Sequence, residues 1–228
     1  MGQSSGIGVL DKAVAVLTAA AARPVSLADL SAGTALPRAT AHRIAVALEV
    51  HGLLARDAEG RWLPGPALSA LAESDPLLAA APAVLRRLSE QSGESAQLYR
   101  REGSWRVCVA AVDRASGLRD TVPVGARLPM TAGSAAQVLA AWPEDAGVPA
   151  GAVFSARTLS LVRRRGWAAS MGQREPGVSS VSAPVFAGDA VVAAVSVSGP
   201  SDRLGRRLGE RLSPAVLRAA RELTTAFG

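Results

Sequence analysis

The segment at residues 25–54 constrains the fold most, because it carries the signals for two helices on either side of a short turn: VSLADLSAGTALPRATAHRIAVALEVHGLL. Ser26 predicts the start of the first helix, since its hydroxyl accepts a hydrogen bond from a free first-turn amide and Asp29 places negative charge near that end. We expect Gly33 to end this helix in the left-handed conformation and Pro37 to open the next one. The turn therefore runs from Gly33 to Pro37.

The second helix is predicted to have an apolar and a polar side. Its apolar stripe follows the spacing i, i+3, i+4 and i+7 and consists of Ala41, Ile44, Ala45 and Leu48. At about 100° per residue, Arg43 lies almost opposite this stripe with His42 nearby. Arg38 and Thr40 flank the first turn. An arginine fork binds two acceptors on a guanine edge, and Thr40 with the helix N-terminus suits phosphate oxygens. The pattern predicts a helix that reads the major groove, although a solvated surface helix has the same spacing.

A β-hairpin is predicted after this helix, in LLARDAEGRWLPG. Its strands are expected at residues 53–56 and 61–63, joined at 57–60 by residues that favour turns. Arg56 and Arg61 flank the tip, where a phosphate or the minor groove would meet them, although charged hairpin tips also occur without a ligand. The pattern indicates a winged helix-turn-helix. Its candidate DNA contacts are Ser26, Arg38, Thr40, His42, Arg43, Arg56 and Arg61.

Composition indicates a soluble globular chain. It has 228 residues, 49% of them hydrophobic, and no apolar run near the roughly 18 residues that cross a bilayer. The start, MGQSSGIGVLDKA, has neither the basic region nor the apolar core of a signal peptide, and lone Cys108 cannot form an intrachain disulfide. We therefore expect a cytoplasmic protein without a membrane partner.

The net charge of +6 is unevenly distributed along the chain. Residues 1–72 carry six basic and five acidic side chains, which leaves a net charge of only +1. The argument for DNA therefore depends on where a few arginines point rather than on bulk charge. Because a module with so few positive groups binds weakly alone, we expect a homodimer or a dimer of dimers that reads a pseudo-palindromic site in double-stranded DNA.

The remaining chain predicts a helical linker and an α+β domain. Two apolar-periodic segments separate near residues 74–76, and one apolar face either covers the next domain or pairs with a second subunit: Leu77, Leu78, Ala81, Val84, Leu85 and Leu88. Strand-like runs follow at 94–102, 105–114, 118–129, 178–186 and 190–198, with helices at 134–142, 155–166 and from Ser213 to about 226. This order predicts helices over an antiparallel sheet. The predicted domains are residues 1–66, 67–92 and 93–228.

Several stretches resemble the IclR family of bacterial transcription regulators. They are GVLDKAVAVLTAAA, ALPRATAHRIAVALEVHGLL, RRRGWA, REPGVSSVSAPV and VVAAVSVSGP. The resemblance implies a GAF-like effector-binding fold for the second domain. More narrowly, GVLDKA, SGESAQLYRR and RASGLRDTVPVG look like the actinobacterial NdgR group, which implies control of amino-acid biosynthesis genes, in particular those of the leucine pathway.

The same resemblance implies a pocket cupped by the sheet. The matching positions here are Leu118, Asp120 and Val122 on the third strand, Met130 and Ser134 at the next helix, and Val178, Ser180, Ser196 and Ser198. Serine hydroxyls in an apolar wall suit an amphipathic small molecule, although serines on strands also bond locally or face solvent. Asp120 is a candidate partner for a ligand ammonium. The family usually has an acidic residue where this chain has Gln173, so the polarity of the ligand is expected to differ.

The residue inventory argues against an enzyme. The histidines are His42 and His51, both in the predicted DNA-binding region, so the second domain lacks a Ser-His-Asp or Cys-His arrangement. Cys108 has no companion at metal-ligand spacing, and no glycine-rich nucleotide motif is present. We expect no catalytic residues, cofactor or metal. The arginines at 163–165 are interpreted as a charged helix end rather than a second nucleic-acid site.

The sequence thus predicts a ligand-responsive transcription regulator whose partners are operator DNA, a small-molecule effector and further copies of the chain. A constitutive regulator, with a second domain that serves only assembly, is the alternative. The sequence does not distinguish an activator from a repressor, because it gives neither the sign nor the size of the coupling between the domains.

Overall fold

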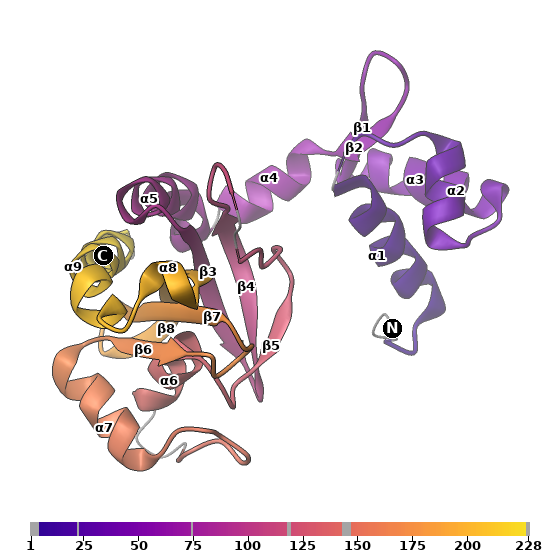
Figure 1. The fold of residues 1–228 in the computed structure, drawn as a ribbon. Helices are drawn as coiled ribbons and strands as arrows, with labels where there is room; N and C mark the ends of the chain where they lie inside the picture. Colours follow the sequence, from indigo (N-terminus) through magenta and orange to yellow (C-terminus); the bar gives the residue numbers. More distant parts are fainter. Residues whose placement is uncertain (1–4, 22, 74, 118–119, 143–146, 227–228) are drawn as a thin grey trace. The chain divides into compact units, whose positions relative to one another are not determined.

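The chain folds into two compact units, residues 1–75 and 76–228. The computed structural model describes residues 5–21, 23–73, 75–117, 120–142 and 147–226 (Figure 1). Helices and a mainly antiparallel arrangement of strands confirm the predicted α+β class. The predicted linker interval is divided between the units, because helix α4 (Pro66–Glu73) lies in the first and α5 (Pro76–Ser92) in the second.

The N-terminal unit is a helical domain with a two-stranded wing. Its elements before α4 are α1 (Gly8–Ala21), α2 (Leu27–Thr34), α3 (Arg38–Val50), β1 (Leu54–Arg56) and β2 (Trp62–Pro64). The wing strands pair antiparallel with Ala55 opposite Leu63. The predicted apolar stripe of α3 faces inward, since Ala41, Ala45 and Leu48 are buried.

The turn between α2 and α3 differs from the prediction. Gly33 lies inside α2, which continues to Thr34, and Ala35 takes the left-handed conformation with φ 55°. The Ser31 hydroxyl donates to the Leu36 carbonyl at 2.7 Å, so it spans the turn from inside the helix. Gly33 was therefore wrong as the helix terminator, because a side-chain bond holds the turn instead of a glycine.

Trp62 anchors the wing to the helices. Its indole is 2% exposed in a core that includes Val16, Leu30 and Leu54. Its backbone amide donates to the Val25 carbonyl at 2.8 Å, and the Val25 amide donates back at 2.9 Å. The base of the wing is thus tied to the segment before α2 as well as to its own hairpin.

Gly65 lets the base of the wing close on the end of α3. A Cβ atom at this position would overlap the Gly52 carbonyl oxygen and lie 2.7 Å from the Leu54 carbonyl oxygen. Both obstacles are backbone atoms, which cannot move aside as a flexible side chain would. Only glycine fits at this position.

We expect Gly65→Ala to lower the unfolding free energy of the N-terminal unit by about 2–3 kcal/mol, because the added methyl forces the backbone apart. Gly33→Ala is the matched control, since a Cβ there meets nothing within 4 Å. In an exposed helix interior that change stabilises by about 0.5–1 kcal/mol. Chemical denaturation followed by circular dichroism measures both; equal effects of the two variants would contradict the packing argument.

The C-terminal unit is built on a six-stranded antiparallel sheet in the order β5-β4-β3-β8-β7-β6. The strands are β3 (Ser95–Glu102), β4 (Trp105–Val112), β5 (Arg127–Pro129), β6 (Ala168–Met171), β7 (Val178–Ala187) and β8 (Ala190–Pro200). The helices after α5 are α6 (Ser134–Ala141), α7 (Ala156–Arg165), α8 (Ser201–Leu204) and α9 (Leu208–Thr225).

Helices cover both faces of this sheet (Figure 1). On one face α5 and α9 lie side by side over an apolar core that includes Leu85, Val195 and Leu223. Five members of the predicted face of α5 are buried here: Leu77, Ala81, Val84, Leu85 and Leu88. This face of α5 therefore covers the domain core. On the other face α6 packs against the sheet, and α7 packs against α6.

Three predictions for this unit were wrong. The third strand is limited to Arg127–Pro129, so Asp120 and Val122 lie outside any strand. Strand β6 was not predicted. Helix α9 begins at Leu208 rather than after Ser213, because Leu208 and Leu212 extend its buried apolar side. No helix in the described part of the chain is long and apolar enough to cross a membrane.

Candidate functional site

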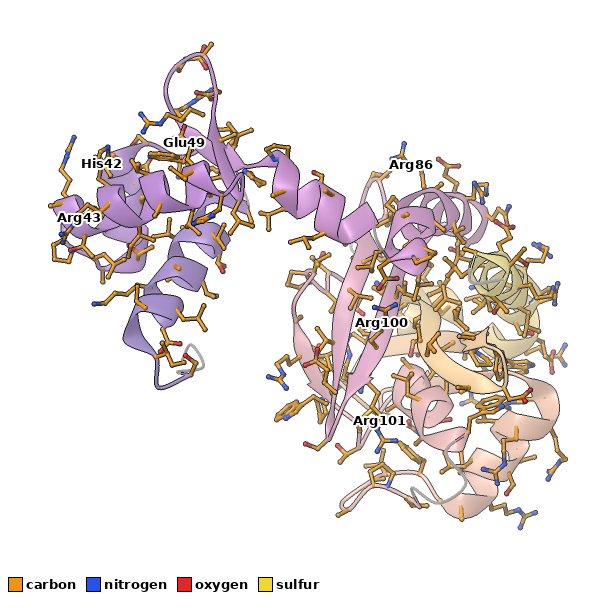
Figure 2. The ribbon with its side chains drawn as sticks, turned by 180° about the vertical axis from the view of Figure 1, so that it is seen from behind. His42, Arg43, Glu49, Arg86, Arg100 and Arg101 are labelled. Atoms are coloured by element: carbon orange, nitrogen blue, oxygen red, sulfur yellow. The ribbon has the colours of Figure 1, made fainter. Side chains whose placement is uncertain are left out.

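The outer face of α3 presents the side chains expected of a DNA-reading helix. Arg38, His42 and Arg43 are exposed, and Thr40 is half-buried at the first turn. Figure 2 shows His42 and Arg43 on this helix. Among the residues that the structure describes, Arg38, His42 and Arg43 have no hydrogen-bond or ion-pair partner, and no side chain caps the N-terminus of α3. The face therefore offers donors and a positive helix end without an internal acceptor.

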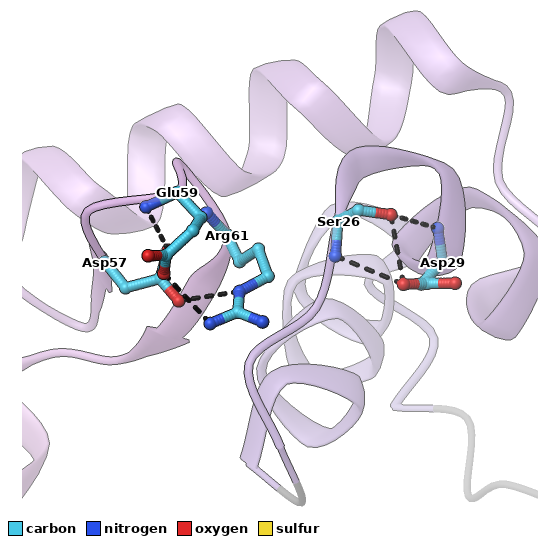
Figure 3. Close-up of polar contacts among 5 residues, drawn as sticks. All are labelled: Ser26, Asp29, Asp57, Glu59 and Arg61. Atoms are coloured by element: carbon cyan, nitrogen blue, oxygen red, sulfur yellow. Dashed lines mark hydrogen bonds and ion pairs between the residues drawn. The ribbon is translucent and has the colours of Figure 1, made fainter.

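The two arginines of the wing are held by acidic neighbours. Arg61 donates from Nε to Asp57 at 2.7 Å and from its terminal nitrogen to Glu59 at 3.0 Å (Figure 3). The bond to Asp57 raises the pKa of the Arg61 guanidinium. Arg56 lies 3.3 Å from Glu49 and 4.0 Å from the centre of the Trp62 ring. The wing thus has less free positive charge than its arginines suggest.

Ser26 is occupied by helix capping. Its hydroxyl accepts from the Asp29 amide at 3.2 Å and donates to the Asp29 carboxylate at 3.0 Å (Figure 3). The carboxylate also accepts from the Ser26 amide at 3.3 Å, which completes a capping box. The first helix start was therefore correctly predicted, and a phosphate contact from this hydroxyl would compete with the cap.

The C-terminal unit encloses a polar cavity of about 20 Å³ between the sheet and the first turn of α6. That volume holds about one ordered water. Six positions taken from the family resemblance line the cavity: Asp120, Ser134, Val178, Ser180, Ser196 and Ser198. The remaining lining residues are Tyr99, Arg106, Gly133, Ala135, Ser170 and Arg174, none of which was predicted from sequence.

Two of the predicted pocket residues lie elsewhere. Val122 and Met130 are 3% and 1% exposed and belong to the apolar cluster around Cys108 and Leu139, not to the cavity wall. The structure places both outside this cavity, because the segment before β5 turns into the core instead of forming a strand, and their contact with an effector stays a prediction. Leu118 lies outside the described residues.

The serines of the cavity wall bond to one another. Ser134 lies 2.7 Å from both Ser180 and Ser182, between hydroxyl oxygens. Ser170 approaches Ser180 at 3.0 Å, and Ser182 donates to Ser196 at 2.9 Å. The strand register explains this chain, since Ser170 pairs with Ser180 and Ser182 pairs with Ser196 across antiparallel strands. These serines make local hydrogen bonds and line the cavity at the same time.

Arg106 and Arg174 bring two positive charges to the cavity. Arg106, on β4, is 2% exposed; one terminal nitrogen donates to the Pro129 carbonyl, and Nε has no partner among the described residues. Burial lowers the pKa of Arg106 to about 10. Arg106 lies two residues before Cys108 on β4, so both side chains point to the same, buried face of the strand. This two-residue spacing was a sequence signal for Arg106.

Asp120 is the carboxylate that faces these arginines. Both of its oxygens accept from one terminal nitrogen of Arg174, each at 2.6 Å. Burial lowers the pKa of Arg174, but the bond and charge of Asp120 outweigh this and the net shift is upward. The pairing of Asp120 with a ligand ammonium stays a prediction; in this structure the carboxylate pairs with Arg174 instead.

Gln173 lies beside the N-terminus of α6 and is not a lining residue of the cavity. Its side-chain oxygen accepts from the Gly133 amide at 3.3 Å and from the Gln137 side chain at 3.0 Å. An acidic residue at this position would add a negative charge, whereas the amide adds none. The cavity therefore keeps two guanidinium groups for one carboxylate.

Cys108 is a buried free cysteine on β4. Burial raises the pKa of the Cys108 thiol to about 12, so the thiolate is scarce at neutral pH. In the described ranges, no group of three His, Cys, Asp or Glu side chains is placed to hold a metal ion.

The fold and these two sites define a class of protein: a winged helix-turn-helix unit joined to a separate α+β domain with a polar cavity. Comparison with known families makes this specific. The IclR helix-turn-helix domain matches residues 9–58, and the C-terminal domain of bacterial IclR regulators matches residues 69–150 and 156–225. The chain belongs to the IclR family of DNA-binding transcriptional regulators.

Known regulators and solved structures are similar to this chain over most of its length. The regulator BhcR of Paracoccus denitrificans is 29% identical, covering 97% of this chain and 88% of its own. The glycerol operon regulatory protein of Streptomyces griseus is 32% identical, covering 86% and 85%. The Thermotoga maritima IclR structure shares the fold, with a TM-score of 0.71, 22% identity and coverage of 97% and 99%. An IclR homologue from Microbacterium hydrocarbonoxydans complexed with 4-hydroxybenzoate has a TM-score of 0.69, 23% identity and coverage of 96% and 98%.

Proposed function

We propose that this protein is a sequence-specific, non-enzymatic transcription regulator whose helix α3 reads operator DNA and whose C-terminal cavity takes a small metabolite. The observation that carries the proposal is the face of α3, where Arg38, His42 and Arg43 are exposed and lack partners in the described part of the chain.

The two parts of the N-terminal unit are assigned different tasks. Arg43 lies on the proposed reading helix, and its guanidinium has no partner in the described ranges, which suits a two-acceptor contact with a guanine edge. Arg61 sits at the wing beside Asp57 and Glu59, where a phosphate would compete with two carboxylates. Base reading is therefore assigned to α3 and backbone contact to the wing.

We expect Arg43→Ala to weaken binding to the specific operator by about 10- to 100-fold and to weaken binding to random duplex much less. Arg61→Ala should weaken both by a similar and smaller factor and reduce the salt slope by about one. Fluorescence anisotropy at several salt concentrations measures both effects. If Arg43→Ala reduced binding to both duplexes equally, Arg43 would not read a base.

An apolar face on α1 supports a dimer. Leu10 and Val14 lie on one side of α1 and are 50% and 52% exposed, and Ile7, which directly precedes the helix, is 58% exposed. Neighbouring exposed apolar side chains are a signal of a protein interface. Because residues 1–72 carry a net charge of only +1, pairing two reading units would add the affinity that one lacks. We assign this face to a second copy of the chain.

We expect Val14→Glu to weaken dimerisation by at least about tenfold, since the interface would bury an unpaired carboxylate. Val50→Glu is the matched control, because Val50 is 77% exposed in the same unit and lies on a different helix. Analytical ultracentrifugation of both full-length variants gives the dissociation constants. An unchanged constant for Val14→Glu would exclude α1 as the dimer contact.

The regulated genes are proposed from the resemblance to the NdgR group. GVLDKA, SGESAQLYRR and RASGLRDTVPVG favour genes of amino-acid biosynthesis, in particular the leucine pathway, and such a regulator would act in the cytoplasm. A metabolite-responsive regulator is favoured over a constitutive one because the C-terminal unit contains a polar cavity with unbalanced charge. The relative crystallised with 4-hydroxybenzoate shows that a member of this fold accommodates a small carboxylate.

The proposal is tested by titrating the full-length protein against DNA upstream of its own gene and of leucine-pathway genes, with and without branched-chain amino acids and their precursors. We expect specific binding that one of these metabolites changes by about 5- to 150-fold, the usual range of coupling between two sites. Specific binding that no metabolite changes would favour the constitutive alternative. Random duplex of equal length and composition is the control.

A further inference from the structure

Strand β6 leaves one edge of the C-terminal sheet open. In the described part of the chain it pairs with β7 on one side and with no strand on the other (Figure 1). Directly after β6, the Gly172 amide donates to the Val178 carbonyl at 2.8 Å. Because the backbone groups of an antiparallel strand alternate in direction, those of Ala169 and Met171 point away from β7. Their amides and carbonyls can therefore pair with a further strand.

A groove of about 430 Å³ lies beside this edge, between β6 and the start of α9. Trp167 forms one of its walls, and Met171, which is 46% exposed, lies farther along the strand. A Cβ atom at Gly209 would lie 2.5 Å from the Trp167 ring, so glycine lets the ring pack directly on α9. The Arg165 guanidinium lies 3.9 Å from the centre of the same ring. The wall is thus formed before any partner binds.

Positive charge dominates this groove. Arg165, Arg206 and Arg207 line it, whereas Glu210 is the carboxylate among the lining residues. Glu210 lies 4.0 Å from Arg207, and both side chains are largely exposed. Within the described ranges, Arg165 and Arg206 have no carboxylate partner. Burial lowers the pKa of Arg165, and no neighbouring carboxylate opposes this shift. The groove is therefore complementary to a segment that carries several negative charges.

We propose that the edge of β6 binds an extended acidic segment of a partner protein. The segment adds a strand beside β6, and its carboxylates meet the three arginines of the groove. Backbone hydrogen bonds supply affinity in this mode of recognition, and the side chains supply selectivity. A DNA backbone would meet the arginines as well, but it has no row of amides and carbonyls to continue the strand ladder. The inference goes beyond the proposed function, because it assigns a protein partner to the C-terminal unit.

The test uses a short acetylated and amidated peptide in which glutamate alternates with valine, labelled with fluorescein and titrated against the full-length protein by fluorescence anisotropy. Two N-methylated forms separate strand addition from charge, one methylated on the glutamate amides and the other on the valine amides. Both keep the charge of the parent peptide, but only one set of amides faces β6. One methylated form should therefore bind about tenfold more weakly than the other.

The contribution of the arginines is tested with Arg206→Glu. This variant should bind the acidic peptide about tenfold or more weakly, because a repulsion replaces an attraction. Arg157→Glu is the matched control, since it makes the same change of charge at an exposed residue of α7 that does not line the groove. A peptide with lysine in place of glutamate should not bind the wild type. Near-ultraviolet circular dichroism confirms that each variant is folded.

Three results would overturn the inference. The first is an acidic peptide that does not bind, or two methylated forms that bind equally. The second is a change of sedimentation coefficient in Arg206→Glu but not in Arg157→Glu without peptide, because a second copy of the chain would then cover the edge. The third is weaker binding of random duplex by Arg206→Glu alone, which would assign the arginines to DNA. Operator binding by the wild type tests the proposed function separately on the same preparation.

Discussion

The hydrogen bonds of Ser134 fix the geometry of the C-terminal site. Its hydroxyl lies 2.7 Å from the hydroxyls of Ser180 and Ser182, which stand on one face of β7 two residues apart. The contact joins the first turn of α6 to the middle of the sheet. Without it the fully buried hydroxyl of Ser134 would lack a hydrogen-bond partner among the described residues, at a cost of about 1–3 kcal/mol. The position of the cavity follows, because it lies between that turn and the strands.

The N-terminal unit meets a different constraint, which is a shortage of free positive charge. Salt bridges with Asp57 and Glu59 engage Arg61, and Glu49 engages Arg56, so the wing has little charge to attract a phosphate backbone over a distance. Long-range attraction gives affinity without sequence preference. With α3 as the proposed reading helix, a unit that lacks this attraction depends more on contacts made at short range, and this favours discrimination between sequences over tight binding to any duplex.

Local signals in the sequence predicted several helix starts correctly. They did not predict the contacts between distant segments. Ser26 and Ser155 were expected at helix starts, and both form capping boxes, because a cap depends on residues within one turn. The start of α9 was missed because Ser213 followed by proline resembles a cap, whereas burial against the sheet extends the helix upstream. Arg174 was missed as well, since its partner lies 54 residues away and no local pattern reports such a pair.

Asp120 lies outside any strand, so the sheet does not fix the direction of its side chain. A residue in the sheet has its direction fixed by the ladder of backbone hydrogen bonds, but the segment before β5 has no such ladder at this position. The guanidinium groups of buried Arg106 and half-buried Arg174 lie beside one small cavity and repel each other, and the Asp120 carboxylate offsets one of these charges. Charge balance in the cavity, rather than strand register, therefore accounts for the place of Asp120.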